Sequence, residues 1–346
     1  MNMPNPLRAK KRSNYISSTL IALMLVLVSS ALEAKPSVLK LATVAPKGSL
    51  YHRALQEMGE KWAAAQGKGS KFLIYTDGSQ GSEASTVRRM RIGQIQAAML
   101  TASGLFEIDE SVSALQFMPL IFNDWNELDY ARERIQSELE EKFRKKGFHI
   151  LFWGEGGWVQ FFSNAKRLSP DDFKKARIFT WEGTRKQVTI LKSLGFNPVV
   201  LELGDIVPGV QTGMLDVVPV APMWALAGQF YRNTPHMLRI NWAPIVGATV
   251  ITTKVWNAMS PEVQEAFTQA AKDAGKTLRD QRHKLDESAI SAMQKRGLIV
   301  HEMTSENRKI WMDFMKPVWP EVRGQIVPAD TFDKVQDAVN EYRMKK

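Results

Sequence analysis

Segments with strand patterns and segments with helix patterns alternate along most of the chain, and this alternation constrains the fold more than any other feature. Residues 38–45 alternate apolar and polar side chains, and residues 49–62 repeat apolar ones at helical spacing. The same order returns with a strand at 72–75, a helix from Ser82 and a strand at 95–100. This succession predicts an α/β fold with a mainly parallel, doubly wound sheet.

A second block repeats the pattern, and a long helix follows it. Strands are predicted at 158–163, 177–181 and 215–220, with short helices between them. Ser260-Pro261-Glu262 then begins a helical segment that no proline interrupts before Gly297, so that the helix would be about 50 Å long. A chain of 346 residues exceeds what one hydrophobic core usually serves. We therefore expect two domains, with the long helix lying across both.

The first 34 residues have the composition of an export signal. Four basic residues lie within 8–12, nine uninterrupted apolar residues follow at 20–28, and small residues lead to Ala34. A membrane-spanning helix needs about twenty apolar residues. We therefore expect a signal peptide at 1–34, cleavage after Ala34 and a periplasmic protein, with an uncleaved membrane anchor as the alternative. No cysteine occurs, which excludes disulfides, thiolate metal sites and cysteine nucleophiles.

Charge and motifs argue against several classes of function. The net charge is +10, but four basic residues and Glu33 belong to the predicted signal, which leaves +7 spread over helix faces. We expect neither nucleic-acid binding nor direct lipid binding from this distribution. The five histidines stand singly, and the chain has no P-loop and no GxSxG, so we predict no catalytic residue, metal or cofactor. An exported serine hydrolase remains an alternative, because Ser163-Asn-Ala-Lys166 matches the SxxK motif.

The predicted strand at 177–181 has side chains suited to binding a small acid. Alternation along a strand places Arg177, Phe179 and Trp181 on one face. A guanidinium can hold a carboxylate through two parallel hydrogen bonds, while aromatic rings contact the apolar body of the same molecule. The alternative is that Arg177 pairs with an aspartate or glutamate of this chain.

Several stretches, taken in order, resemble the periplasmic solute-binding subunits of TRAP transporters of the DctP type. They are KLATVAPKGSLYHRALQEMGEKW, YTDGSQGSEASTVRRMRIGQIQAAML, LQFMPLIF, ARIFTWEG, GDIVPGVQTGMLD and SPEVQEAFTQAAKDAG. The resemblance extends from Leu39 to about Arg323. It implies a two-lobed, periplasmic-binding-protein-like α/β fold in which the long helix is a hinge or strut. The implied lobes are residues 35–157 plus about 246–282, and residues 158–245 plus about 283–346.

The resemblance also implies a binding site. Arg177 falls in the strand that carries the family's carboxylate-binding arginine, whereas no arginine is present at 157–158, where many members place a second one. Residues 217–224 are mostly apolar where relatives carry polar side chains. These departures favour a monocarboxylate with an apolar or aromatic body over sugar acids. The predicted ligand-binding residues are Arg177, Trp181, Thr180, Trp158, Thr101, Ser103 and Trp224.

The function implied by the resemblance is that of an extracytoplasmic solute receptor, which is not an enzyme. It would act as a monomer that encloses an organic acid between two lobes and delivers it to the TRAP membrane subunits. A ligand-binding module for a sensory receptor is the other alternative, and the sequence does not separate these two roles.

Overall fold

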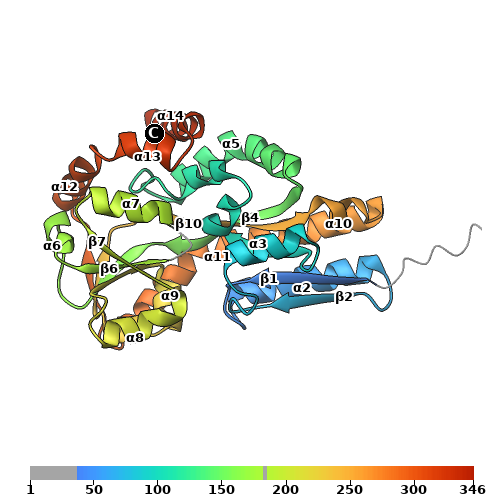
Figure 1. The fold of residues 1–346 in the computed structure, drawn as a ribbon, viewed down its shortest axis with the longest axis horizontal. Coiled ribbons are helices and arrows are strands. Elements are labelled where there is room, and N and C mark those ends of the chain that lie inside the picture. Colours follow the sequence, from blue (N-terminus) through green and yellow to red (C-terminus); the bar gives the residue numbers. More distant parts are fainter. Residues whose placement is uncertain (1–36, 182–184) are drawn as a thin grey trace, which may run out of the picture.

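The chain forms two α/β lobes, each built on one β-sheet (Figure 1). A computed structural model describes residues 37–181 and 185–346, so the predicted signal peptide at 1–34 lies outside the described residues. Within the described residues, no helix has both the length and the apolar character that crossing a membrane requires.

The first sheet has the strand order β2-β1-β3-β10-β4. Its strands are β1 (Val38–Thr43), β2 (Lys71–Tyr75), β3 (Ala97–Thr101), β4 (Phe148–Trp158) and β10 (Pro244–Thr252). The helices that accompany these strands are α2 (Leu50–Gln66), α3 (Glu83–Arg91), α4 (Ala102–Phe106), η1 (Glu110–Leu115), α5 (Trp125–Lys145) and α10 (Thr253–Asn257).

The second sheet has the strand order β11-β9-β5-β8-β6-β7. Its strands are β5 (Gln160–Ser163), β6 (Arg177–Trp181), β7 (Asn197–Leu201), β8 (Val217–Val220), β9 (His236–Arg239) and β11 (Ile299–Glu302). The helices around it are α6 (Pro170–Lys174), α7 (Arg185–Ser193), η3 (Leu203–Asp205), α8 (Ile206–Gln211), α9 (Pro222–Ala227), η4 (Phe230–Arg232), α12 (Ser305–Met315) and α13 (Trp319–Gln325).

The sheets are mainly parallel, as predicted, but each contains a strand that runs against its neighbours. Strand β10 is antiparallel to β3 and β4, and β5 is antiparallel to β8 and β9. Strand β4 leads directly into β5, and β9 leads into β10. A strand that leaves the carboxyl edge of one sheet enters the other sheet from its carboxyl edge, and so it must run in reverse there. The carboxyl edges of the two sheets consequently face each other.

The two crossing segments lie side by side and form the hinge between the lobes. The backbone N–H of Val159 donates to the carbonyl of Ala243 at 2.9 Å, and the N–H of Trp242 donates to the carbonyl of Val159 at 3.0 Å. Backbone hydrogen bonds therefore join the two crossings at the point where the chain passes between sheets.

Two further helices connect distant parts of the chain. Helix α11 (Pro261–Gln294) begins after Ser260, whose side chain accepts from the N–H of Val263. It packs on α2 and β4 in one lobe and on α9 in the other, which confirms its expected position. Helix α14 (Ala329–Met344) packs beside α5 of the first lobe (Figure 1). An ion pair between Arg343 and Glu127 at 2.8 Å joins these two helices. The exact lobe boundaries stay a prediction.

Candidate functional site

A cavity of about 410 Å³ lies between the facing carboxyl edges of the two sheets. Ligands in α/β proteins bind at such edges, because loops that follow the strands present side chains there. The first lobe contributes Val44, Pro46, Asp77, Thr101, Ser103, Gln116, Phe117 and Pro119. The hinge and the adjoining ends of β5 and β10 contribute Val159, Phe161, Trp242, Ala243 and Ile245. The second lobe contributes Ile178, Phe179, Thr180, Trp181, Ile190, Leu191, Phe196, Leu203, Gly204, Pro219, Val220, Trp224 and Phe230.

The wall of this cavity is mostly apolar and aromatic. Its polar side chains, apart from the indoles, are those of Asp77, Thr101, Ser103, Gln116 and Thr180. No lysine or arginine occurs among the lining residues within 37–181 and 188–346. The described wall therefore suits an apolar or aromatic body that has few polar groups.

Arg177 does not line this cavity, and its contacts do not support the predicted role as carboxylate anchor. Its guanidinium donates from Nε and Nη2 to the two oxygens of Asp216, at 2.8 and 2.9 Å. These hydrogen bonds from Arg177 lower the pKa of Asp216 to about 2. The internal ion pair, which was the alternative, is the arrangement found.

The physical reason is the direction of strand β6. Arg177 is its first residue and Trp181 its last, so the two are about 13 Å apart along the strand although they share a face. The cavity lies at the carboxyl end, where Trp181 is. Alternation predicted the shared face correctly but could not place both residues at the same end.

The predicted tryptophans have different positions. Trp181 and Trp224 line the cavity, together with Thr180. Trp158, which was predicted to contact the ligand, is not among the described residues that line it. Its buried ring packs against that of Trp125 with a centroid distance of 4.9 Å, on the side of helix α5.

Thr101 and Ser103, both predicted to bind the ligand, line the cavity from the opposite lobe. The hydroxyl of Thr101 is already engaged, since it donates to Glu83 at 2.5 Å and accepts from the N–H of Ser103 at 3.3 Å. The hydroxyl of Ser103 makes no hydrogen bond with any other described residue, so of these two hydroxyls it is the one available to a ligand.

Glu83 holds this part of the wall and was missed in the sequence analysis. Its carboxylate accepts from the N–H of Thr101 at 2.7 Å and from the N–H of Gly104 at 3.1 Å, besides the Thr101 hydroxyl. It is buried, and burial raises its pKa, while the hydrogen bonds from Thr101 and Gly104 oppose that shift. In the sequence, a glutamate directly after the cap Ser82 looks like an ordinary first-turn acid.

We expect Glu83→Ala to lower the free energy of unfolding by about 2 kcal/mol, because buried N–H groups at residues 101 and 104 lose their acceptor. Urea unfolding measures this difference. Glu57→Ala, at an exposed position of helix α2, is the control and should change stability by less than about 0.5 kcal/mol. Equal effects of the two substitutions would contradict the positioning role of Glu83.

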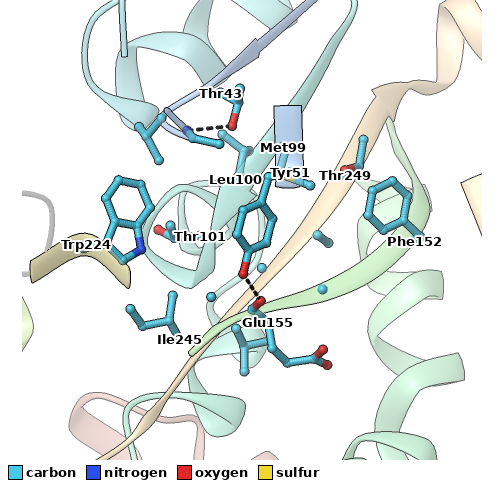
Figure 2. A pocket seen from close by; sticks show the side chains of 17 residues that line it. Thr43, Tyr51, Met99, Leu100, Thr101, Phe152, Glu155, Trp224, Ile245 and Thr249 are labelled. Atoms are coloured by element: carbon cyan, nitrogen blue, oxygen red, sulfur yellow. Dashed lines mark hydrogen bonds between the residues drawn. The ribbon is translucent and has the colours of Figure 1, made fainter. Parts of the chain in front are cut away.

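A smaller pocket of about 50 Å³ adjoins the cavity (Figure 2). Val44, Thr101, Trp224 and Ile245 line both spaces. The hydroxyl of Tyr51, at the edge of the pocket, donates to the backbone carbonyl of Glu155 at 2.7 Å.

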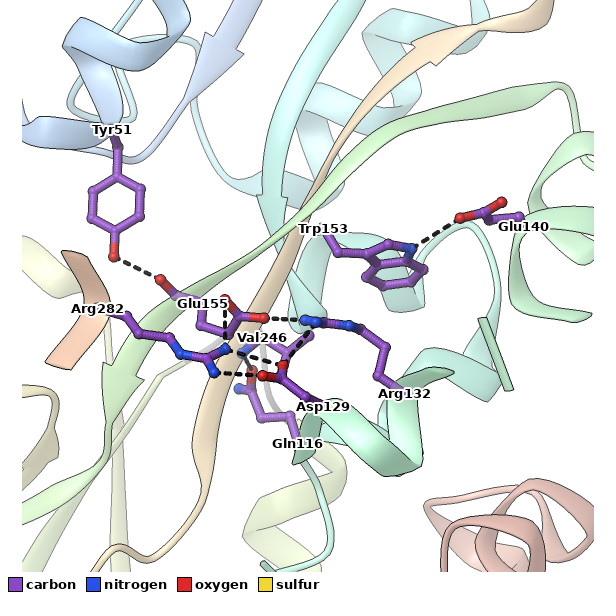
Figure 3. Close-up of polar contacts among 9 residues, drawn as sticks. All are labelled: Tyr51, Gln116, Asp129, Arg132, Glu140, Trp153, Glu155, Val246 and Arg282. Atoms are coloured by element: carbon purple, nitrogen blue, oxygen red, sulfur yellow. Dashed lines mark hydrogen bonds and ion pairs between the residues drawn. The ribbon is translucent and has the colours of Figure 1, made fainter. Parts of the chain in front are cut away.

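A buried cluster of charged side chains joins α5, β4 and α11 (Figure 3), and its Glu155 also lines the smaller pocket. Arg132 pairs with Glu155 and, at 2.8 Å, with Asp129. Arg282 of α11 binds Asp129 at 2.5 Å and approaches Glu155 at 3.5 Å. Both arginines are almost completely buried. This cluster ties the hinge strand β4 to the two helices.

The arrangement around Ser163 does not resemble a nucleophilic site. Its hydroxyl is buried and donates to the carbonyl of Ala165 at 2.7 Å, whereas Lys166 is exposed. Ser163 also does not line the cavity. Over the part of the chain that the structure describes, no three or more histidine, aspartate or glutamate side chains converge as a metal site requires.

Comparison with known proteins agrees with this architecture. The family of bacterial extracellular solute-binding proteins, family 7 (DctP), matches residues 41–325. The C4-dicarboxylate-binding periplasmic protein DctP of Rhodobacter capsulatus is 23% identical over 328 residues, covering 92% of this chain and 96% of that protein. The 2,3-diketo-L-gulonate-binding periplasmic protein YiaO of Escherichia coli is 23% identical over 251 residues, which cover 70% and 74%.

Solved structures show the same fold. A TRAP periplasmic solute-binding protein from Ochrobactrum anthropi superposes with a TM-score of 0.80 at 20% identity, covering 90% of this chain and 98% of that one. One from Haemophilus influenzae, with bound L-gulonate, gives a TM-score of 0.78 at 21% identity and covers 90% and 100%. The predicted two-lobed fold is confirmed. The chain belongs to family 7 of the bacterial extracellular solute-binding proteins, the DctP family.

Proposed function

We propose that this protein is the periplasmic solute receptor of a TRAP transporter, and that it binds a small organic acid with an apolar or aromatic body. The observation that carries the proposal is the 410 Å³ cavity, whose wall comes from both lobes and is mostly apolar and aromatic. A ligand held there contacts both sheets at once. It therefore favours the closed arrangement of the lobes, which membrane subunits could distinguish from the open one.

The wall argues for a ligand with few hydroxyl groups. Neighbours of similar fold hold L-gulonate or β-D-galacturonate, which are rich in hydroxyls. Each buried hydroxyl needs a hydrogen-bond partner, or its transfer from water is unfavourable. Phe179, Trp181 and Trp242 offer ring surface instead. A monocarboxylate of benzoate or phenylacetate type fits this wall better than a sugar acid.

Ser103 and Thr180 are the hydroxyl groups best placed to donate to the ligand carboxylate. They lie on opposite lobes, and both line the cavity. The hydroxyl of Thr180 is buried and has no hydrogen-bond partner among the residues described. A carboxylate that bound both hydroxyls would link the two lobes.

A thermal-shift screen of the purified protein tests the ligand class. We expect benzoate, phenylacetate or a related apolar monocarboxylate to raise the melting temperature, because a ligand that binds only the folded state stabilises it by mass action. L-Gulonate, D-galacturonate and succinate serve as the comparison set. Stabilisation by the sugar acids alone would contradict the proposed ligand class. Genes for two membrane subunits beside this one would favour transport over a sensory role.

Substitutions at the two ends of strand β6 distinguish a residue that binds the ligand from one that stabilises the fold. We expect Trp181→Ala to weaken binding of the best acid about tenfold, because apolar contact area in the cavity is lost.

Arg177→Ala should leave the affinity for the same acid within about twofold of wild type. Its effect is on stability, because Asp216 has a pKa lowered from 3.8 to about 2 in the folded protein. That contribution is present above pH 4 and is lost as the pH falls towards 2.

Isothermal titration measures the affinities of both variants, and urea unfolding at pH 6 and pH 2 measures the stability of Arg177→Ala. Loss of binding in Arg177→Ala, with its stability unchanged, would restore the arginine as the carboxylate anchor.

A further inference from the structure

We propose that the 50 Å³ pocket beside the main cavity is a subsite for a short apolar branch of the bound acid, about two carbon atoms in size. This inference rests on the proposed function. A protein cavity of about 150 Å³ holds one benzene molecule, so a third of that volume holds a methyl or ethyl group. In the following, this space is called the side pocket (Figure 2).

The side pocket is continuous with the main cavity. Val44, Thr101, Trp224 and Ile245 line both, so a ligand in the main cavity can extend a branch into the side pocket without leaving its position.

The walls of the side pocket favour carbon over polar groups. Its apolar lining comes from Val44, Ala45, Met99, Leu100, Phe152, Ile245, Val246 and Ala248. Two of its hydroxyl groups already have partners, since Tyr51 donates to the carbonyl of Glu155 and Thr43 accepts from the N–H of Ala45 at 3.1 Å.

The remaining polar groups do not change this preference. The hydroxyl of Thr249 and the indole Nε1–H of Trp224 are buried without a partner among the described residues. These two donors are fewer than the hydrogen bonds that a second carboxylate can accept. The carboxylate of Glu155 is held by Arg132 and Arg282 (Figure 3). A charged or hydroxylated branch would lose its bonds to water here, whereas an alkyl group gains contacts.

Trp224 gives the side pocket a link to lobe closure. It belongs to α9 of the second lobe, whereas the other described lining residues belong to elements of the first lobe. An alkyl branch therefore meets a complete wall only when the lobes are closed. Its binding energy would favour the closed state, and the side pocket would select ligands through closure.

The test compares benzoate with its 2-, 3- and 4-ethyl derivatives by isothermal titration. We expect one ethyl isomer to bind about tenfold tighter than benzoate, as burial of two carbons predicts. Gly154→Ala should abolish this gain and leave benzoate binding unchanged. Gly154 lines the side pocket, and a Cβ there would meet no atom closer than 3.9 Å, so the variant should fold and place its methyl group in this space.

Gly204→Ala is the matched control. Gly204 lines the main cavity but not the side pocket, and a Cβ there would have no neighbour within 4 Å. This variant should keep the gain for the ethyl isomer. The subsite is overturned if wild type binds benzoate but no ethyl isomer more tightly, or if the two variants affect the gain equally.

Failure of the ligand class can be told apart from failure of the subsite. If wild type binds neither benzoate nor its derivatives, the proposed ligand class is wrong, and crystals under xenon pressure then test the side pocket directly. Xenon between Met99 and Phe152 in wild type, absent in Gly154→Ala, supports an apolar subsite. No xenon in wild type overturns it.

Discussion

Replacing Arg132 by leucine is expected to lower the free energy of unfolding by about 3–5 kcal/mol, because it leaves a buried carboxylate without its nearest partner. Glu155 is 3% exposed and Arg132 is also 3% exposed, so water cannot replace the lost contact. Arg282 reaches Glu155 only at 3.5 Å and also binds Asp129. Urea unfolding followed by circular dichroism measures the change.

Arg144→Leu provides the matched control on the same helix. Arg144 pairs with Glu141, but their side chains are 52% and 46% exposed, so the loss should stay below about 1 kcal/mol. A similar loss of unfolding free energy in both variants would show that the buried ion pairs of Arg132 contribute no more to stability than an exposed pair. A variant that also replaces Glu155 by leucine should recover part of the loss, because no buried charge is then left unpaired.

Asp286→Asn is expected to stabilise the protein above pH 7, by up to about 4 kcal/mol, and to have little effect near pH 4. Burial raises the pKa of Asp286 to about 7, with a smaller rise from Glu287, while the hydrogen bond from the N–H of Trp158 and the charge of Arg239 oppose it. The folded protein therefore prefers the protonated carboxyl. Between about pH 4 and pH 7 the Asp286 carboxyl loses its proton in the unfolded chain but keeps it in the folded protein. The free energy of unfolding therefore falls as the pH rises through this range.

Asparagine cannot ionise, and its side-chain oxygen can still accept from the N–H of Trp158, which Asp286 binds at 3.1 Å. Urea unfolding at pH 5 and pH 8 tests the prediction, with a larger gain at pH 8. Asp280→Asn, at an exposed position on the same helix, is the control and should show a change below about 0.5 kcal/mol at both values. A gain of Asp286→Asn that is the same at pH 5 and pH 8 would refute titration as its cause.

The asparagine variant also probes the hinge. Asp286 lies on α11 and binds the backbone at the end of β4, directly before the crossing into β5. A contact here shifts the balance of open and closed lobes only where its strength differs between the two states, and the affinity of the variant for the best ligand of the screen measures that difference.

Local patterns predicted the secondary structure well at several places. Strand β6 has the predicted limits, and α11 follows Ser260 and runs across both lobes as predicted. These features depend on residues a few positions apart, whose periodicity and capping groups can be read directly. The reversal of β5 and β10 was not predicted, because strand direction depends on which sheet the chain enters.

The binding site was predicted less completely. Trp181, Thr180, Trp224, Thr101 and Ser103 line the cavity, but Trp158 packs on Trp125 and Arg177 binds Asp216. The roles of Arg177 and Trp158 were inferred from residue type and family resemblance. Residue type and resemblance do not show which residue, distant in the chain, each of these side chains contacts in the folded protein.

The sequence alone determined the family, the alternation of strands and helices, and the long helix that spans both lobes. Each of these depends on the order and spacing of neighbouring residues. Only the tertiary structure decided which side chains face the cavity. Arg177 and Asp216 are 39 residues apart in the chain, and Glu83 and Thr101 are 18 apart, so their contacts exist only once the strands have packed. The end of a strand at which a residue lies, and the partner it meets there, are set by that packing.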